Sequence, residues 1–254
     1  MKWTSEDAQR WAVFSGDHNP IHFDRAAAQA AGADDVTVHG MRAMWDLKQQ
    51  MAHSWKATRA GELHCGIRLR QPLLTDTSYA LTALPDTRGV QGEIRHSSTG
   101  ICCFSGRLEE KANPFVTPAD LSLRPLKTDN TFRYPFSRRD WCYLDALLFK
   151  LIVDAPESMA VVHRVLPELQ AQTLGDVFLL LPIVQTHHDI WLTYDLFSLP
   201  ALPPVLTCAP LPSLVMGDRQ NGFILQMRAA CLSEGKMVMT TAVTLKTWPV
   251  AVSN

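Results

Sequence analysis

The chain has 254 residues, of which 46% are hydrophobic and 19% are charged, so it can bury a substantial core. Its 24 lysines and arginines are balanced by 25 acidic residues, which gives a formal net charge of −1. This balance excludes the basic surplus that a protein needs to bind nucleic acid along the phosphate backbone.

The sequence also indicates a cellular compartment. Residues 1–7 are largely polar or charged and lack the apolar core of a secretory signal, and no stretch reaches the roughly 18 apolar residues of a membrane span. Six cysteines are scattered without a C-x-x-C pair, so zinc-ligand spacing is absent. We therefore expect a cytoplasmic protein without a membrane span, whose reduced thiols pack in the core.

Helices are predicted in the first quarter of the chain. Thr4 and Asp7 have the spacing of a capping box, and Gly16 marks the end of the helix that follows. Residues 25–31 are rich in alanine and predict a short helix. Residues 40–55 predict a stronger helix, because apolar side chains recur there on one stripe. The stripe consists of Met41, Met44, Trp45, Met51, Ala52 and Trp55.

Strands are predicted for the rest of the first half. Apolar and polar residues alternate around Cys65, Ile67 and Leu69, and Pro72 ends that run. Further strands are predicted at 79–84, 92–96 and 101–108, separated by turn-forming residues. The first half therefore reads as a long helix followed by an antiparallel meander.

The second half repeats this order after a proline-rich linker. An apolar stripe predicts a helix over residues 141–152, which Pro156 ends. Strands are predicted next, at 177–184, 190–196, 223–231 and 236–246. The segment 196–218 contains five prolines and is predicted to be an irregular loop.

The repeated order predicts an internal duplication. We expect a first unit over residues 1–112, a linker over 113–130 and a second unit over 131–254.

One short segment carries the residues suited to chemistry. Asp17 and His22 lie five residues apart on a loop that Asn19 and Pro20 restrict, so both side chains can turn into one pocket. Such a pair suits acid–base work near neutral pH. Gly40 opens the long helix, where a free backbone N–H can stabilise a developing oxyanion. Together these groups suit proton abstraction next to a carbonyl.

The segment Gly16-Asp17-x-Asn19-Pro20-x-His22-x-Asp24, with a later His39-Gly40-Met41, resembles the (R)-specific enoyl-CoA hydratase motif of MaoC-like proteins. The resemblance covers roughly residues 1–110. It implies a hot-dog fold of the α+β class, in which an antiparallel sheet wraps a central helix, here residues 40–55.

The resemblance also implies roles for individual residues. Asp17 and His22 would hold the catalytic water, and the Gly40 N–H would polarise the thioester carbonyl. We place Asn19, His39 and Met41 with the substrate-binding residues. The implied reaction interconverts 2-enoyl and (3R)-3-hydroxyacyl thioesters, and no metal or redox cofactor is implied.

The chain departs from the family pattern in two respects. His18 stands where the family often has an aromatic or other bulky residue. The second half lacks the motif, so we expect a fused double hot-dog form with two antiparallel sheets, each wrapping a central helix, and a degenerate second unit. In eukaryotic fused members the working motif commonly lies in the second half, whereas here it lies in the first.

Structural roles compete with the functional ones. Asp17 alone could cap a turn, and His22 alone could be a core histidine. Asp24 is predicted to cap the alanine-rich helix, and His39 to brace the start of the long helix. Met41 and Met44 are predicted to pack in the core, although methionines also suit an acyl chain.

Two further groups of residues have ordinary explanations. His187, His188 and Asp189 resemble a metal site, but neighbours on a strand point to opposite faces. Arg68 and Arg70, or Arg138 and Arg139, could contact phosphates of coenzyme A or of a carrier-protein arm; more often such charges form a solvated surface.

Three functions remain open at this stage. The first is the hydratase or dehydratase, acting on an acyl-CoA or acyl carrier protein thioester. The second is an acyl thioesterase, since one fold hosts both activities. The third is a non-catalytic partner that binds an acyl chain or carrier protein. The sequence also leaves open a homodimer or a monomeric pseudo-dimer.

Overall fold

The computed structural model describes residues 1–56, 61–115, 121–126 and 140–250. The first half contains α1 (Ser5–Ser15), the 3₁₀ turn η1 (Pro20–His22), α2 (Arg25–Ala30), α3 (Gly40–Ser54), β1 (Glu62–Leu69), β2 (Tyr79–Asp86), β3 (Gly89–His96) and β4 (Cys102–Glu110). The second half contains β5 (Arg124–Pro125), α4 (Trp141–Asp154), α5 (Pro156–Val165), α6 (Leu174–Leu180), β6 (Ile183–Thr193), α7 (Tyr194–Ser198), β7 (Thr207–Asp218), β8 (Gly222–Ser233) and β9 (Lys236–Thr247).

The nine strands of the described ranges form one antiparallel sheet in the order β2-β3-β4-β1-β6-β9-β8-β7-β5. Apart from the short edge strand β5, the order of the second half mirrors that of the first across the β1–β6 pair. The predicted double hot-dog fold is therefore confirmed. The expectation of two separate sheets is wrong, because β1 and β6 hydrogen-bond to each other and join the units. Strand β1 also pairs with β4 rather than with β2, so in the first half the meander consists of β2, β3 and β4 without β1.

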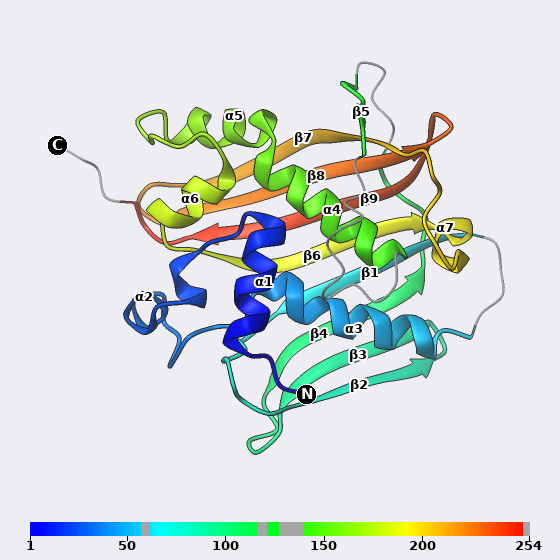
Figure 1. Ribbon diagram of the computed structural model, residues 1–254, viewed down its shortest axis with the longest axis horizontal. Coiled ribbons are helices and arrows are strands. Elements are labelled where there is room, and N and C mark those ends of the chain that lie inside the picture. Colours follow the sequence, from blue (N-terminus) through cyan, green and yellow to red (C-terminus); the bar gives the residue numbers. More distant parts are fainter. Residues whose placement is uncertain (57–60, 116–120, 127–139, 251–254) are drawn as a thin grey trace.

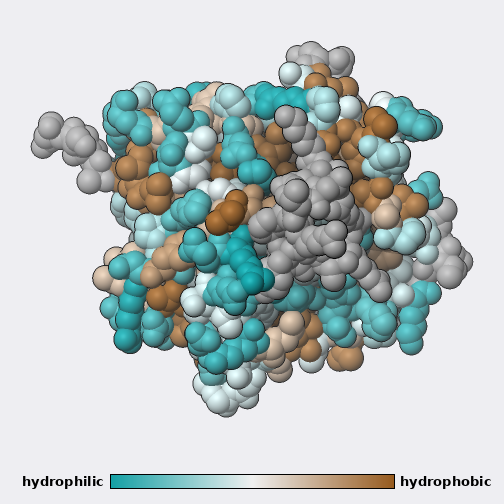
Figure 2. Space-filling model, viewed as in Figure 1, coloured by the Kyte–Doolittle hydropathy of each residue, from teal (hydrophilic) through white to brown (hydrophobic). Residues whose placement is uncertain are grey.

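The two central helices, α3 and α4, lie side by side across one face of the sheet (Figure 1). Helix α3 packs on β1 to β4 and buries Met41, Met44, Leu47 and Met51, while α4 packs on β7 to β9. The predicted core role of these methionines is confirmed. Figure 2 shows hydrophilic and hydrophobic residues interspersed over the outside of this helix-bearing face.

The local signals of the first half produce the predicted helices. The Thr4 side chain caps α1 in a capping box with Asp7, and Gly16 ends the helix in a left-handed conformation with a φ of 77°. The Asp24 carboxylate caps α2 by accepting the Ala27 N–H at 2.7 Å, as predicted. Strand β2 runs on through Pro85, which was expected in a turn; as an edge strand, β2 tolerates a missing donor.

The predictions were less accurate in the second half. Residues 177–184 were expected to form a strand, but α6 occupies 174–180, and its start is fixed by a capping box of Thr173 with Asp176. The strand expected at 190–196 is the end of the longer β6, and α7 follows it. Pro156 does end α4, but it also takes the first position of α5, where proline needs no N–H partner.

The segment 196–218 is only partly irregular. Its second part forms β7, which includes Pro210 and Pro212. The register of β7 with β8 shifts between Leu211 and Leu214, and the outer neighbour of β7 is only the two-residue β5. An irregular strand near a sheet edge accommodates proline. The high proline content of this segment therefore predicted a loop where part of the segment forms a strand.

A buried polar cluster joins the two units. The Asp145 carboxylate of α4 accepts hydrogen bonds from Lys48 Nζ of α3 at 2.5 Å and from Thr241 Oγ1 of β9 at 2.6 Å. His188 Nε2 of β6 lies 2.9 Å from both Asp145 oxygens. All four side chains are buried. The predicted metal alternative for residues 187–189 loses its support, since His188 faces the interior and Asp189 pairs with His64 on the other face at 2.8 Å.

The cysteines are free thiols, and all except the partly exposed Cys102 are buried, in agreement with the predicted core role. In the described ranges, no helix combines the length and the apolar character needed to cross a membrane.

Candidate active site

The loop after α1 is held by short-range hydrogen bonds and by the second unit. The Asp17 N–H donates to Ser15 Oγ at 3.1 Å, and the Asn19 N–H donates to Asp17 Oδ1 at 3.2 Å. Asn19 then caps η1 by accepting the Ile21 N–H at 3.3 Å. Its amide nitrogen donates to the Ile183 carbonyl of β6 at 3.0 Å, so the loop is tied to the other half of the chain.

Asp17, His22 and His39 converge in space. One donor or acceptor atom of each side chain lies within 4.8 Å of such an atom of each of the other two. His22 Nδ1 lies 2.9 Å from the Thr37 carbonyl, and a carbonyl can only accept, so Nδ1 carries a proton. In the neutral ring, Nε2 is then the nitrogen that can accept a proton.

His39 lies behind His22 as a stacked neighbour. The two ring centroids are 3.7 Å apart with an interplanar angle of 29°. His39 Nε2 donates to the Asp17 backbone carbonyl at 3.0 Å, so His39 positions both members of the pair. His39 occupies the N-cap position of α3, but its side chain makes no capping hydrogen bond to that helix.

Burial changes the protonation of all three groups. It raises the pKa of Asp17, partly offset by the opposite charge of His22 and by the Asn19 N–H. Burial lowers the pKa of His22, partly offset by Asp17 and by the Thr37 carbonyl. Burial, reinforced by His22, lowers the pKa of His39 well below the usual value. The pKa values of Asp17 and His22 therefore move toward each other, which suits the exchange of a proton.

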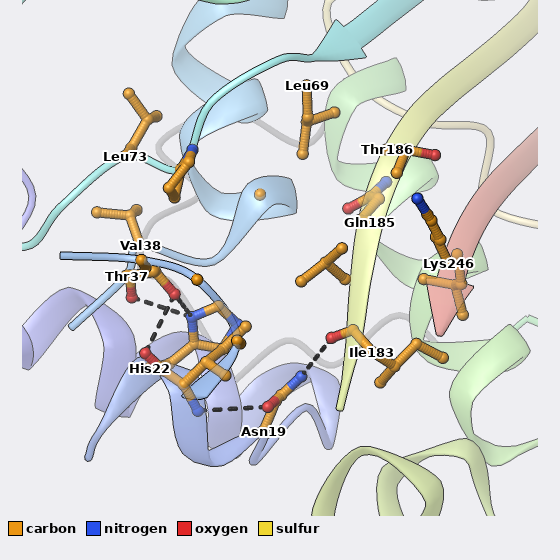
Figure 3. Close-up of a pocket in the computed structure, with 18 of the residues that line it drawn as sticks. Asn19, His22, Thr37, Val38, Leu69, Leu73, Ile183, Gln185, Thr186 and Lys246 are labelled. Atoms are coloured by element: carbon orange, nitrogen blue, oxygen red, sulfur yellow. Dashed lines mark hydrogen bonds between the residues drawn. The ribbon is translucent and has the colours of Figure 1, made fainter. Parts of the chain in front are cut away.

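Asp17 and His22 line a cavity of about 350 Å³, within the range of small-molecule sites. The first unit contributes Asp17, Asn19, His22 and Gly40 to its lining, together with residues 69–73. The second unit contributes the other side. In Figure 3, Leu69 and Leu73 lie on one side of the cavity and Ile183, Gln185, Thr186 and Lys246 lie on the other.

Gly40 brings a backbone amide to this cavity. It is the first residue of α3, where an N–H has no acceptor within the helix and the helix dipole is positive. A Cβ at this position would lie 2.7 Å from Leu69 Cδ2 and 3.1 Å from Gln185 Oε1. Glycine is therefore required for Leu69 and Gln185 to approach the helix start this closely.

The family model described as "MaoC like domain" matches residues 1–54, from α1 to the end of α3. Residues 1–54 are therefore similar to a MaoC-like domain. This match confirms the resemblance that the motif indicated. A comparison with curated proteins gives no match.

Several solved structures are similar to this chain over most of its length. A MaoC-like dehydratase shares 12% identity over 99% of this chain and 95% of that chain, with a TM-score of 0.45. A hot-dog protein of unknown function from Alicyclobacillus acidocaldarius shares 11% over 84% and 88%, with a TM-score of 0.43. An acyl-CoA thioesterase II, TesB2, from Mycobacterium marinum shares 14% over 86% and 93%, with a TM-score of 0.44.

The structure brings most of the site residues predicted for the MaoC-like motif together. Asp17, His22, Gly40 and Asn19 line the cavity. His39 and Met41 are not among the lining residues; His39 acts through its contacts with His22, and Met41 lies in the core.

Sequence reasoning missed the residues that the second unit contributes. Gln185, Thr186 and Lys246 belong to no recognisable motif. The pairing of β6 and β9 brings them to the site, beside the loop that carries Asp17 and His22.

The cluster of Asp17, His22 and His39 also has the residue types of a metal site. However, the two imidazoles are stacked and nearly parallel, so their in-plane lone pairs run side by side instead of converging on one ion. His22 Nδ1 and His39 Nε2 are both engaged with backbone carbonyls. The stacked arrangement of the two rings therefore favours an acid–base pair over a metal centre.

Proposed function

We propose that the protein is an (R)-specific hydratase/dehydratase that interconverts 2-enoyl and (3R)-3-hydroxyacyl thioesters. The observation that carries this proposal is the convergence of Asp17 and His22 in a cavity that also holds the first amide of α3. If the thioester carbonyl lies near the Gly40 N–H, the 2,3-double bond of the enoyl chain lies close to Asp17 and His22.

In the hydration direction, a water molecule lies between Asp17 and His22. One member of the pair takes a proton from the water, and the oxygen forms a bond to C3 of the enoyl chain. The electron pair of the double bond moves toward the carbonyl oxygen, where the Gly40 N–H stabilises the enolate. The pair then returns a proton to C2, and the thioester bond is kept. Because Asp17 and His22 are coupled, the titration belongs to the pair.

The test is hydration of a short-chain enoyl-CoA, followed by loss of the conjugated double bond and by chiral analysis of the product. We expect Asp17→Asn and His22→Gln each to lower turnover by about 10²–10⁴-fold, the usual contribution of a general acid or base. Unchanged circular dichroism shows that the variants are folded. Full activity in folded variants would refute the assignment.

A thioesterase is the second candidate, because the same water and the same amide could serve attack on the carbonyl carbon instead of C3. Release of a free thiol from an acyl-CoA, with the same dependence on Asp17, would favour this reaction. A non-catalytic binding partner would bind thioesters without turnover, and its binding would be indifferent to Asp17→Asn.

We also propose that residues 1–112 form the catalytic unit, residues 113–130 the linker and residues 131–254 a second unit without a motif. In this division, the second unit supplies one side of the cavity and no acid or base. The proposed location is the cytoplasm.

A further inference from the structure

A bulge in β6 turns a polar side chain of the second unit toward the cavity. The register of β6 with β9 shifts between Gln185 and His187, so Thr186 is the extra residue of the bulge. In a regular strand, positions 185 and 188 would face opposite sides of the sheet. Because of the bulge, Gln185 and His188 both face the helices, where His188 joins the buried cluster and Gln185 lines the cavity.

Three acceptors surround one end of the Gln185 carboxamide. Its nitrogen Nε2 lies 3.4 Å from His188 Nδ1, 3.5 Å from the His187 carbonyl oxygen and 3.7 Å from Met41 Sδ. A carbonyl oxygen can only accept a hydrogen bond, so this end of the carboxamide is the NH₂ group. The other end, the oxygen Oε1, is then the end that meets the cavity.

The buried cluster favours the same orientation. Burial alone would raise the pKa of Asp145, but His188 and Lys48 hold this pKa below its usual value, so the carboxylate is ionised and only accepts. His188 Nε2, which lies 2.9 Å from both carboxylate oxygens, is therefore the nitrogen that carries a proton. In the neutral ring, Nδ1 is then an acceptor, and an acceptor there selects the NH₂ group of Gln185 over its oxygen.

The Gln185 oxygen lies beside the start of α3. It is 3.1 Å from the position that a Cβ would take on Gly40. Figure 3 shows Gln185 across the cavity from His22, with its oxygen on the cavity side. Within the described ranges, no donor of the chain bonds to this oxygen. The cavity therefore offers a ligand the Gly40 N–H as a donor and the Gln185 oxygen as an acceptor close by.

This arrangement suits a ligand that carries a carbonyl group and, a short distance away, an N–H group. Neither the enoyl chain nor the sulfur of a thioester carries an N–H. The first N–H along the thiol arm of coenzyme A, or of a carrier protein, belongs to the cysteamine amide, two carbons beyond the sulfur. An acceptor beside the carbonyl site is therefore matched to this amide.

We propose that Gln185 is a specificity-determining residue that accepts a hydrogen bond from the cysteamine amide, and that His188 and Asp145 hold it in the accepting orientation. The inference rests on the proposed function and deepens it, because it defines the thiol portion of the substrate as an N-acylated cysteamine. With the thioester carbonyl at the Gly40 N–H and C3 near the acid–base pair, the thiol arm leaves the pair on the side of Gln185. The second unit thus recognises the thiol, while the first unit acts on the acyl group.

The test compares two thioesters of the same short 2-enoic acid. The S-(2-acetamidoethyl) thioester has the N–H, and in the S-(2-acetoxyethyl) thioester an ester oxygen replaces it. The ratio of their kcat/KM values should favour the amide in the wild type and should fall about three- to tenfold in Q185M, as expected for the loss of one hydrogen bond. A general effect of the variant on folding or on the acid–base pair changes both rates equally and leaves the ratio unchanged.

The matched control is Q226M, the same change at a half-buried glutamine of β8 that is not among the residues lining the cavity. Its ratio should equal that of the wild type. If Q185M and Q226M have the same ratio, Gln185 does not recognise the amide.

The orientation of Gln185 has a measurement of its own. In the wild type at pH 7, nitrogen NMR of the histidine rings should show His188 as the neutral tautomer with its proton on Nε2. A proton on Nδ1 would point at the NH₂ group of Gln185 and would overturn the inferred orientation. A purely structural role of His188 in the core makes no such demand on Nδ1.

Binding without turnover separates this inference from the proposed reaction. Butanoyl thioesters of the same two thiols have no double bond to hydrate, and NMR titration gives their Kd values. If the amide binds more tightly than the ester in Q226M but not in Q185M, and no enoyl thioester is hydrated, Gln185 has the inferred role and the proposed reaction fails. If enoyl thioesters are hydrated with a ratio that Q185M leaves unchanged, the reaction stands and the role of Gln185 is wrong.

Discussion

The buried cluster that links the two central helices gives the sharpest stability prediction. Lys48 is 1% exposed and Asp145 is fully buried, and the carboxylate accepts hydrogen bonds from Lys48 and Thr241 and contacts His188. The variant Asp145→Asn keeps the size and most hydrogen bonds but removes the negative charge. The Lys48 ammonium would then be buried without a counter-charge.

Removing one partner of a buried ion pair costs about 3–5 kcal/mol. That is a large part of the roughly 5–15 kcal/mol that stabilises a typical domain. For a chain of this length it corresponds to a fall in Tm of about 10 °C. Urea unfolding followed by circular dichroism measures the loss, provided that the slope of the transition is unchanged.

A double variant provides the control. In Lys48→Met with Asp145→Asn, neither charge remains and asparagine can still contact His188 and Thr241. We expect this double variant to be more stable than Asp145→Asn alone by about 2 kcal/mol. If Asp145→Asn costs less than about 1 kcal/mol, or if the double variant is the less stable of the two, the charge pair does not stabilise the fold as reasoned.

Three further predictions concern the site. Because burial lowers the pKa of His39, its neutral form contributes stability above pH 6.5, and this stability is lost as the pH falls through the lowered pKa. The Tm of the protein should therefore decline between pH 6.5 and 5, and it should decline less steeply in the His39→Gln variant. Burial raises the pKa of Asp17, so the stability that its protonated form contributes is present at low pH and is lost as the pH rises through the raised pKa. In urea unfolding at pH 7, Asp17→Asn should therefore raise the free energy of unfolding by about 1 kcal/mol, and a lower value would contradict this reasoning. The variant Gly40→Ala should lower kcat/KM at least about tenfold, because its Cβ displaces Leu69 beside the amide, while Tm changes little since the flexible end of that side chain can move; unchanged kinetics would show that the close approach of Leu69 to the helix start is not needed for the reaction.

The first half of the fold could be predicted because its signals are local. The capping box at Thr4, the glycine after α1 and the apolar stripe of α3 each act within a few residues, and the structure has all three. Asp17 and His22 were found for the same reason, since both lie on one short loop. Their convergence needs only the 3₁₀ turn between them.

The second half was harder because its short apolar runs do not distinguish helix from strand. Residues 177–180 form a helix only because Thr173 and Asp176 cap its start, a signal that lies just before the run. Gln185 and Lys246 could not be assigned to the site at all. Their position depends on a register between distant strands, which no local pattern specifies.

The hydrogen bond from Asn19 to the Ile183 carbonyl connects residues 164 positions apart and has a consequence for how the chain could be divided. A fragment that ended before the linker would keep every residue of the motif. It would lose the Ile183 carbonyl that anchors the loop, and it would also lose the Gly175 backbone that packs against Gly16. In the proposed division, the second half is therefore a template on which the catalytic half takes its shape. Changes in β6 far from Asp17 in sequence should alter the chemistry as directly as changes within the motif.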